Sequence, residues 1–128
     1  MRVAELHHKE ILELDPDGGV NRFAGQRVLL LDAVAMGVLR HYLVDKLGLT
    51  AARAVLTQFG FAHGWRMAAA MQKEFNWEDD DEWRLAGTRI HTLGGLFCIQ
   101  QGNEDPLSEK GATFLSSYEA EQHLLHFG

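Results

Sequence analysis

The chain has 128 residues and a formal net charge of -6, with 46% hydrophobic and 23% charged residues. This length fits one domain with its own core, and the composition is typical of a globular protein. The acidic balance argues against a standing role on nucleic-acid phosphates, which require clustered Lys and Arg. Cys98 is the one cysteine, which excludes an internal disulfide and a cysteine-rich zinc site.

The beginning of the chain, MRVAELHHKE, lacks the apolar core of a signal peptide. No apolar run reaches the roughly 18 residues that a membrane-spanning helix requires. We therefore expect a reduced, soluble, cytoplasmic domain without membrane contact.

The first predicted element is a β-hairpin around the sequence DPDGG, which begins at Asp15. Proline fixes one φ angle, and the two glycines permit positive φ, so the segment favours a tight turn. Because two strands alone are marginally stable in water, this hairpin must pack on the body or on a partner chain.

The next predicted element is a helix from Gln26 to Leu47, with Gly48 as its stop. Its few charged residues point in scattered directions, which indicates burial on more than one side. A subunit interface and a central core helix both remain open.

A second long helix is predicted from Thr50, as N-cap, to about Glu74. Gly60 and Gly64 lie one turn apart on one face of it and cost about 1 kcal/mol each against alanine. Tight helix packing or a kink would compensate that cost. His63, between them, is predicted to pack.

The rest of the chain predicts an acidic segment, a second hairpin and a final helix. WEDDDEW (77–83) indicates a solvated loop or a helix start and is assigned no chemistry. GGLFCIQQG predicts a strand, a polar turn follows, and ATFLSS predicts an antiparallel partner. SSYEAEQHLLHFG predicts a helix capped by Ser117. The predicted class is α+β: an N-terminal β-hairpin, two long helices, a second β-hairpin and a C-terminal linking helix.

No nucleophile elbow, phosphate-binding loop, HExxH or dinucleotide fingerprint occurs in the sequence. His123 and His126 could bind a metal with Glu119, but no further ligand accompanies them. We therefore expect no metal and no cofactor. An enzyme, or a tetrapyrrole-binding protein, would use His91 with Arg89 or His63 as acid–base partners, yet no nucleophile or paired carboxylate accompanies them.

His91 stands among apolar residues in RIHTLGGLF. A neutral imidazole donates from one nitrogen and accepts on the other, which suits a hydroxyl or carbonyl on an otherwise apolar molecule. From periodicity alone, a hydrogen-bonded core histidine remains the alternative.

The long run from ELDPDGGVNRF to TQFGFAHG, together with RIHTLGG and SSYEAEQHLLHFG, resembles the XylR N-terminal domain, called activator of aromatic catabolism. The resemblance runs from about Glu10 to Gly128. It implies the sensory region of a sigma-54-dependent bacterial transcription activator that responds to phenol-, toluene- or biphenyl-like compounds. In this family the sensor represses a downstream AAA+ ATPase domain, and effector binding releases it.

The resemblance also implies a domain organisation. Residues 1–25 would form an N-terminal hairpin for homodimerisation, and residues 26–128 the sensor domain. The last helix would lead into a four-vinyl-reductase-type domain that completes the pocket, and AAA+ and helix-turn-helix domains would follow. On this reading the chain is a fragment, and this domain itself does not contact nucleic acid.

Site residues follow from the same resemblance. His91 matches the histidine that hydrogen-bonds the effector's hydroxyl, and Phe114 falls where phenol-sensing members carry a tryptophan with an indole N–H donor. Leu93, Phe97 and Trp83 are candidate wall residues, with ordinary core packing as their alternative. Because phenylalanine has no donor, we expect an effector less polar than phenol, such as an alkylbenzene or biphenyl type. A dimerisation and inter-domain repression module remains the alternative function.

Overall fold

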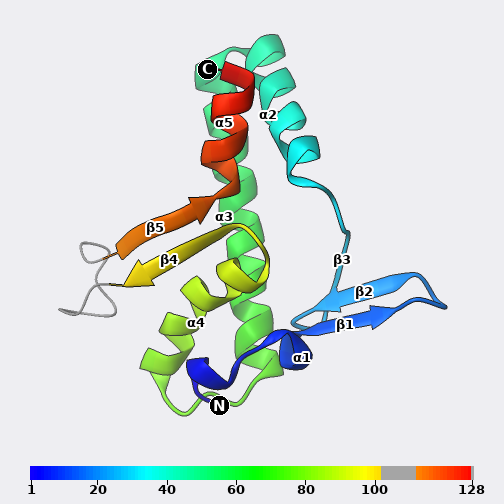
Figure 1. Cartoon of the computed structure of the whole chain (residues 1–128), viewed down its shortest axis with the longest axis vertical. Helices are drawn as coiled ribbons and strands as arrows, with labels where there is room; N and C mark the ends of the chain where they lie inside the picture. Colours follow the sequence, from blue (N-terminus) through cyan, green and yellow to red (C-terminus); the bar gives the residue numbers. More distant parts are fainter. Residues whose placement is uncertain (102–111, 128) are drawn as a thin grey trace.

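The computed structural model describes residues 1–101 and 112–127, which form an α+β fold with two antiparallel sheets. The predicted class is therefore confirmed (Figure 1). In chain order the elements are η1 (Val3–Glu5), α1 (His8–Ile11), β1 (Leu12–Asp15), β2 (Val20–Phe23), β3 (Gln26–Val28), α2 (Ala33–Leu47), α3 (Leu49–Glu74), α4 (Asp80–Leu93), β4 (Phe97–Gln101), β5 (Ala112–Ser117) and α5 (Tyr118–Phe127).

The N-terminal sheet has the order β1-β2-β3 and projects sideways from the body (Figure 1). The predicted DPDGG turn joins β1 to β2: the Asp15 carboxylate accepts from the Gly18 N–H at 2.9 Å, and Gly19 has a φ of 67°. The prediction of a helix beginning at Gln26 is wrong. A tight turn at Ala24 and Gly25 instead pairs β3 with β2, and α2 begins after Asp32, whose carboxylate caps Ala35.

The two long helices meet at Gly48, whose φ of 80° lets it end α2 and start α3. Gly48 is therefore the N-cap of α3, and the expectation of Thr50 as N-cap is wrong. Helix α3 ends at Glu74, as predicted. Gly60 and Gly64 face open space, so no backbone in the described part of the chain makes the close approach that their spacing suggested.

Helix α4 is an element that the predicted order lacks. It begins inside the acidic segment, where the Asp79 carboxylate caps the Glu82 N–H at 2.8 Å. The β4–β5 hairpin follows, as predicted, while the polar turn between its strands lies outside the described residues. Ser117 Oγ accepts from the Ala120 N–H at 3.4 Å, which confirms the predicted cap of α5.

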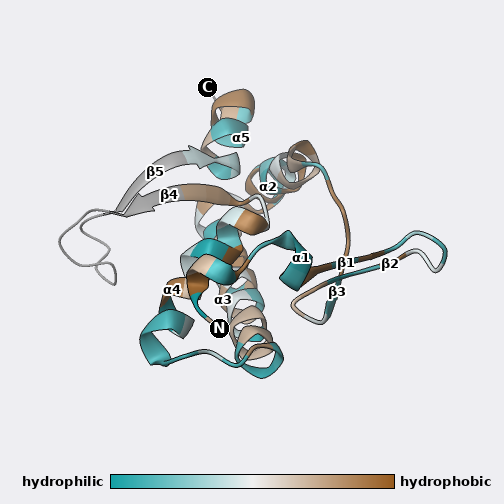
Figure 2. Ribbon diagram, turned by 60° about the horizontal axis from the view of Figure 1, so that its bottom comes forward, coloured by the Kyte–Doolittle hydropathy of each residue, from teal (hydrophilic) through white to brown (hydrophobic). Residues whose placement is uncertain are grey.

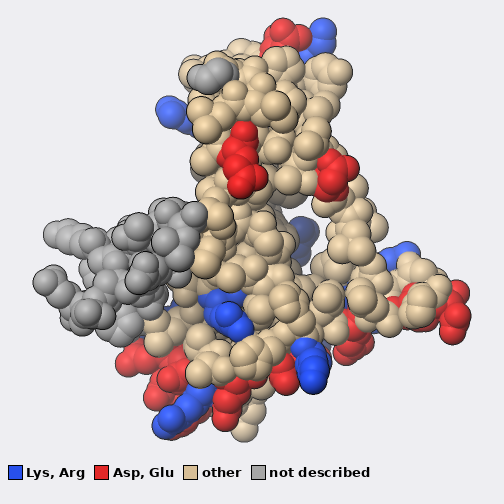
Figure 3. Space-filling view, in the orientation of Figure 1, with Lys and Arg blue, Asp and Glu red and all other residues tan. Residues whose placement is uncertain are grey.

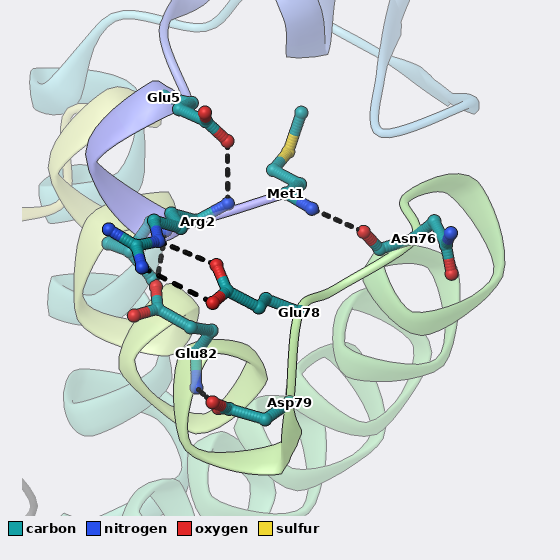
Figure 4. A network of polar contacts seen from close by, with 8 residues as sticks. Met1, Arg2, Glu5, Asn76, Glu78, Asp79 and Glu82 are labelled. Atoms are coloured by element: carbon teal, nitrogen blue, oxygen red, sulfur yellow. Dashed lines mark hydrogen bonds and ion pairs between the residues drawn. The ribbon is translucent and has the colours of Figure 1, made fainter.

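The core lies at one end of the molecule, between the N-terminal segment, the second half of α3 and α4 (Figure 1). Its buried members are Leu6, Ile11, Ala24, Ala70, Met71, Ala86 and Ile90. The first residues are held there by polar contacts (Figure 4): the Met1 amine donates to the Asn76 carbonyl, and Arg2 pairs with Glu78 at 2.5 Å. Residues 1–11 thus belong to the body.

The other end of the molecule leaves more of its hydrophobic side chains exposed. Helix α5 packs beside α2, and the extended connection from β3 to α2 stands away from α3 (Figure 1). This connection is hydrophobic (Figure 2), and its Leu29, Leu30 and Leu31 are 77%, 77% and 63% exposed. A gap separates it from the body, whereas acidic side chains gather around α4 (Figure 3). None of the helices that the structure describes could cross a membrane.

Candidate functional site

His91 lies in the last turn of α4, at the corner where the chain turns into β4. The corner is fixed by the Leu96 N–H, which donates to the His91 carbonyl at 2.9 Å, and by Gly95 at a φ of 78°. As a result, the first residue of β4, Phe97, returns over the imidazole, with 4.7 Å between ring centroids and 30° between ring planes. The imidazole is half-buried, so it is neither free in solvent nor sealed in the core.

Burial lowers the pKa of His91 because it disfavours the imidazolium form. A hydrogen bond to the Gly87 carbonyl acts in the opposite direction, and the nearby His63 lowers the pKa further. The ring is therefore neutral at pH 7 and can offer a lone pair or an N–H to a polar group in an apolar setting.

The other predicted site residues have different settings. Leu93 packs against the core cluster, and its carbonyl lies 3.1 Å from His8 Nε2. Trp83 is half-buried two turns before His91 on α4. The backbone of Phe114 pairs with Ile99 across the second sheet, while its side chain lies outside the described residues. The structure thus brings His91 and Phe97 together and gives Leu93 a core contact.

Two further aromatic residues lie on α3: Phe59, which was not predicted as a site residue, and His63, which was considered only as an acid–base partner in the enzyme alternative. Their rings are nearly parallel, with centroids 6.1 Å apart and an interplanar angle of 9°. Both are exposed, and His63 is close enough to influence the pKa of His91. Leu56, Phe59, His63 and Met67 are three or four residues apart and so share one face of α3. This periodicity was the sequence signal that could have found Phe59 and His63.

The acid–base alternative gains no support from Arg89. Its guanidinium points to the N-terminal segment, where Nε donates to the Leu6 carbonyl at 2.9 Å and Nη2 lies 3.0 Å from His7 Nδ1. Among residues 1–101 and 112–127, no group of three or more His, Cys, Asp or Glu side chains is arranged to bind a metal. Thus Arg89 stabilises the body rather than acting on His91.

A shallow depression lies between α2, α5 and the end of β5, away from His91. Arg40 crosses it, 3.5 Å from the Glu119 carbonyl and 3.4 Å from His123 Nδ1. It is lined by Arg40, Ser117, Glu119, Ala120, His123 and Leu124. The depression lies where α5 packs on α2, and none of the predicted site residues lines it.

Comparison with known proteins identifies the family. The chain belongs to the family described as activator of aromatic catabolism, whose model matches residues 8–103. The chain is 31% identical over 120 residues to the phenol regulator MopR of Acinetobacter guillouiae, a match that covers 89% of this chain and 21% of that protein. The resemblance to the XylR N-terminal domain is therefore confirmed.

A solved structure shows the same arrangement. The crystal structure of the phenol-responsive sensory domain of the transcription activator PoxR with phenol matches with a TM-score of 0.82 at 26% identity. The match covers 98% of this chain and 64% of that chain. The chain therefore spans about a fifth of the curated relative and under two thirds of the solved domain.

Proposed function

We propose that this chain is the effector-sensing region of a sigma-54-dependent transcription activator and binds a small aromatic compound. The observation that carries this proposal is the His91–Phe97 pair, which places a neutral, half-buried imidazole against an aromatic ring at the α4–β4 corner. The phenol-responsive character of the similar sensory domain supports the same chemistry. The proposed role is regulatory and non-enzymatic, in the cytoplasm.

We further propose that the effector is less polar than phenol. Burial of an aromatic ring of about 200 Å² contributes roughly 5 kcal/mol, whereas one net hydrogen bond contributes about 0.5–1.5 kcal/mol. Phe114 offers no hydrogen-bond donor, so His91 would supply the one polar contact. The apolar fit of the ring would then supply most of the affinity. The hydrogen bond to His91 would decide between rings with and without a polar group.

Calorimetric titration of the natural full-length protein with phenol and with toluene tests both proposals. We expect H91A to weaken phenol binding by about twofold to twelvefold and to leave toluene binding nearly unchanged. The exposed His123 provides the control, and H123A should bind both compounds like the wild type. Binding of neither compound by the wild type would contradict sensing. A clear preference for phenol would contradict only the less polar effector.

A second candidate role, in dimerisation and inter-domain repression, is favoured by the exposed leucines of the β3–α2 connection. We propose that the projecting part of residues 1–25 and this connection form a homodimer contact. In this role the region would repress the AAA+ domain of the same regulator until the effector binds. The region itself would contact neither nucleic acid nor a membrane. Both roles can coexist, because His91 lies on a different element from these leucines.

A further inference from the structure

Helix α3 carries one continuous stripe of residues that should face the interior. Positions spaced three and four apart share a helix face. The stripe consists of Ala52, Leu56, Phe59, His63, Met67 and Ala70. Ala52 is buried at the end where α2 packs, and Ala70 is buried in the core. The middle of the stripe is open, since Phe59 is 55% exposed although it faces the same way.

The open section is short and aromatic. It lies between the half-buried Leu56 and Met67, which are eleven residues apart and so about 16 Å apart along the axis. Within it, Phe59 and His63 present two nearly parallel rings, and a side chain at Gly60 would meet nothing within 4 Å. The exposed faces of these two rings offer an apolar surface on which another aromatic ring can stack favourably.

The open section also borders the His91 site. Helix α3 packs against α4, and α4 packs against β4, which carries Phe97. His63 lies near enough to His91 to lower its pKa. The two aromatic pairs, Phe59–His63 and His91–Phe97, thus lie on elements that pack against one another.

Resting on the proposed function, we propose that Phe59 and His63 form a second wall of the effector-binding site and contact the apolar face of the ring. They determine which ring shapes are accepted, while His91 supplies the polar contact. The occupant is a small aromatic compound rather than a second protein chain.

Comparison of F59A with F61A in the natural full-length protein tests this wall. Phe61 is a matched control because it is 73% exposed and stacks on Trp65 at 6.3 Å, two residues along α3 on the opposite face. We expect F59A to weaken toluene and phenol binding alike by about threefold to tenfold. F61A should bind as the wild type does. The milder F59L, which keeps apolar bulk, should fall between them and replaces F59A if that variant fails to fold.

A second measurement needs no ligand. In NMR titrations of the histidine rings, H63Q should raise the pKa of His91, because the charge on His63 no longer opposes protonation there. An unchanged His91 pKa would show that the two residues do not share a site and would overturn the second wall.

The remaining outcomes separate the inference from the proposed function. If H91A weakens phenol binding while F59A and F61A behave alike, the second wall is wrong and the sensing role stands. If F59A changes the molecular mass in solution but not the affinity, the surface binds protein, and the inference is overturned. If the wild type binds neither aromatic compound, the sensing role itself is contradicted.

Discussion

At the scale of single residues, the main feature is a histidine kept neutral by its surroundings. His91 is half-buried against Phe97, and burial lowers its pKa. When the folded pKa is lower than the unfolded one, the unfolded chain binds more protons as the pH falls through this range. His91 therefore contributes stability that is present above the unfolded value of about 6.5 and is lost as the pH falls through the folded pKa.

We accordingly expect the H91Q variant to lose less stability than the wild type when the pH is lowered from 7.5 to 5.5. Glutamine does not titrate, so the linked proton uptake on unfolding is absent. Urea unfolding at both pH values provides the measurement, with H123Q as a control at an exposed position. An equal loss of stability in H91Q and the wild type would contradict the assignment.

How much of the candidate site could be predicted depends on how close its residues lie to one another in the sequence. His91 and Phe97 are six residues apart in one apolar segment, so the segment drew attention to the histidine, but only the family resemblance assigned a site role to both residues. Phe59 and His63 are more than 25 residues away from His91, and only the packing of α3 against α4 brings them near it. From the sequence alone, His63 was expected to pack, because it lies between Gly60 and Gly64 on the predicted helix.

At the scale of elements, the contact between α2 and α5 depends on a missing side chain. A Cβ at Gly37 would lie 2.3 Å from Gln122 Oε1 and 2.9 Å from its Cβ. Gln122 is itself buried, and its Oε1 has no hydrogen-bond partner among the described residues. The glutamine cannot move aside without losing its packing, so Gly37 sets the distance between the two helices.

We expect G37A to destabilise the protein by about 1–2 kcal/mol, after the gain of about 1 kcal/mol in helix propensity is subtracted. G64A is the matched control, because its added methyl group would meet nothing within 4 Å. That variant should be more stable by about 0.5–1 kcal/mol. Thermal and urea unfolding measure both changes, and a stabilised G37A would show that α5 does not pack closely on α2.

The elements that were predicted correctly have local signals, and those that were missed do not. The DPDGG turn, Gly48 and Ser117 specify their turn, helix end and cap through their own backbone and side-chain chemistry. Strand β3 exists because Gln26–Val28 pairs with β2, and three residues carry too little periodicity to show this. The acidic segment was predicted as a solvated loop or a helix start, and the second alternative is confirmed, because Asp79 supplies the N-cap of α4. What the prediction lacked was the continuation of this helix to Leu93.

At the scale of the whole molecule, one end is well packed and the other is not. The core cluster joins the N-terminal segment, α3 and α4. By contrast, the extended β3–α2 connection is separated from the body by a gap, and its Leu29, Leu30 and Leu31 are exposed. Three consecutive leucines exposed in this way support the proposed contact with another chain, since burial of a leucine contributes about 1.5–3 kcal/mol.

The L30Q variant tests the proposed homodimer contact. We expect it to weaken self-association by about tenfold or more, because a buried leucine would be replaced by a polar amide. The 67% exposed Leu49 lies at the α2–α3 corner, so L49Q serves as the control. Light scattering coupled to gel filtration provides the masses. A wild type that is monomeric at high micromolar concentration would contradict the contact.

Strand β5 passes into α5 without an intervening loop, and the Tyr118 N–H at their boundary donates to the Leu96 carbonyl at 3.1 Å. The second hairpin and the last helix are therefore directly continuous, and their junction is hydrogen-bonded next to the corner that holds His91. Because α5 also packs on α2, where Gln122 lies directly against Gly37, a displacement of the hairpin would be transmitted to the contact between these two helices.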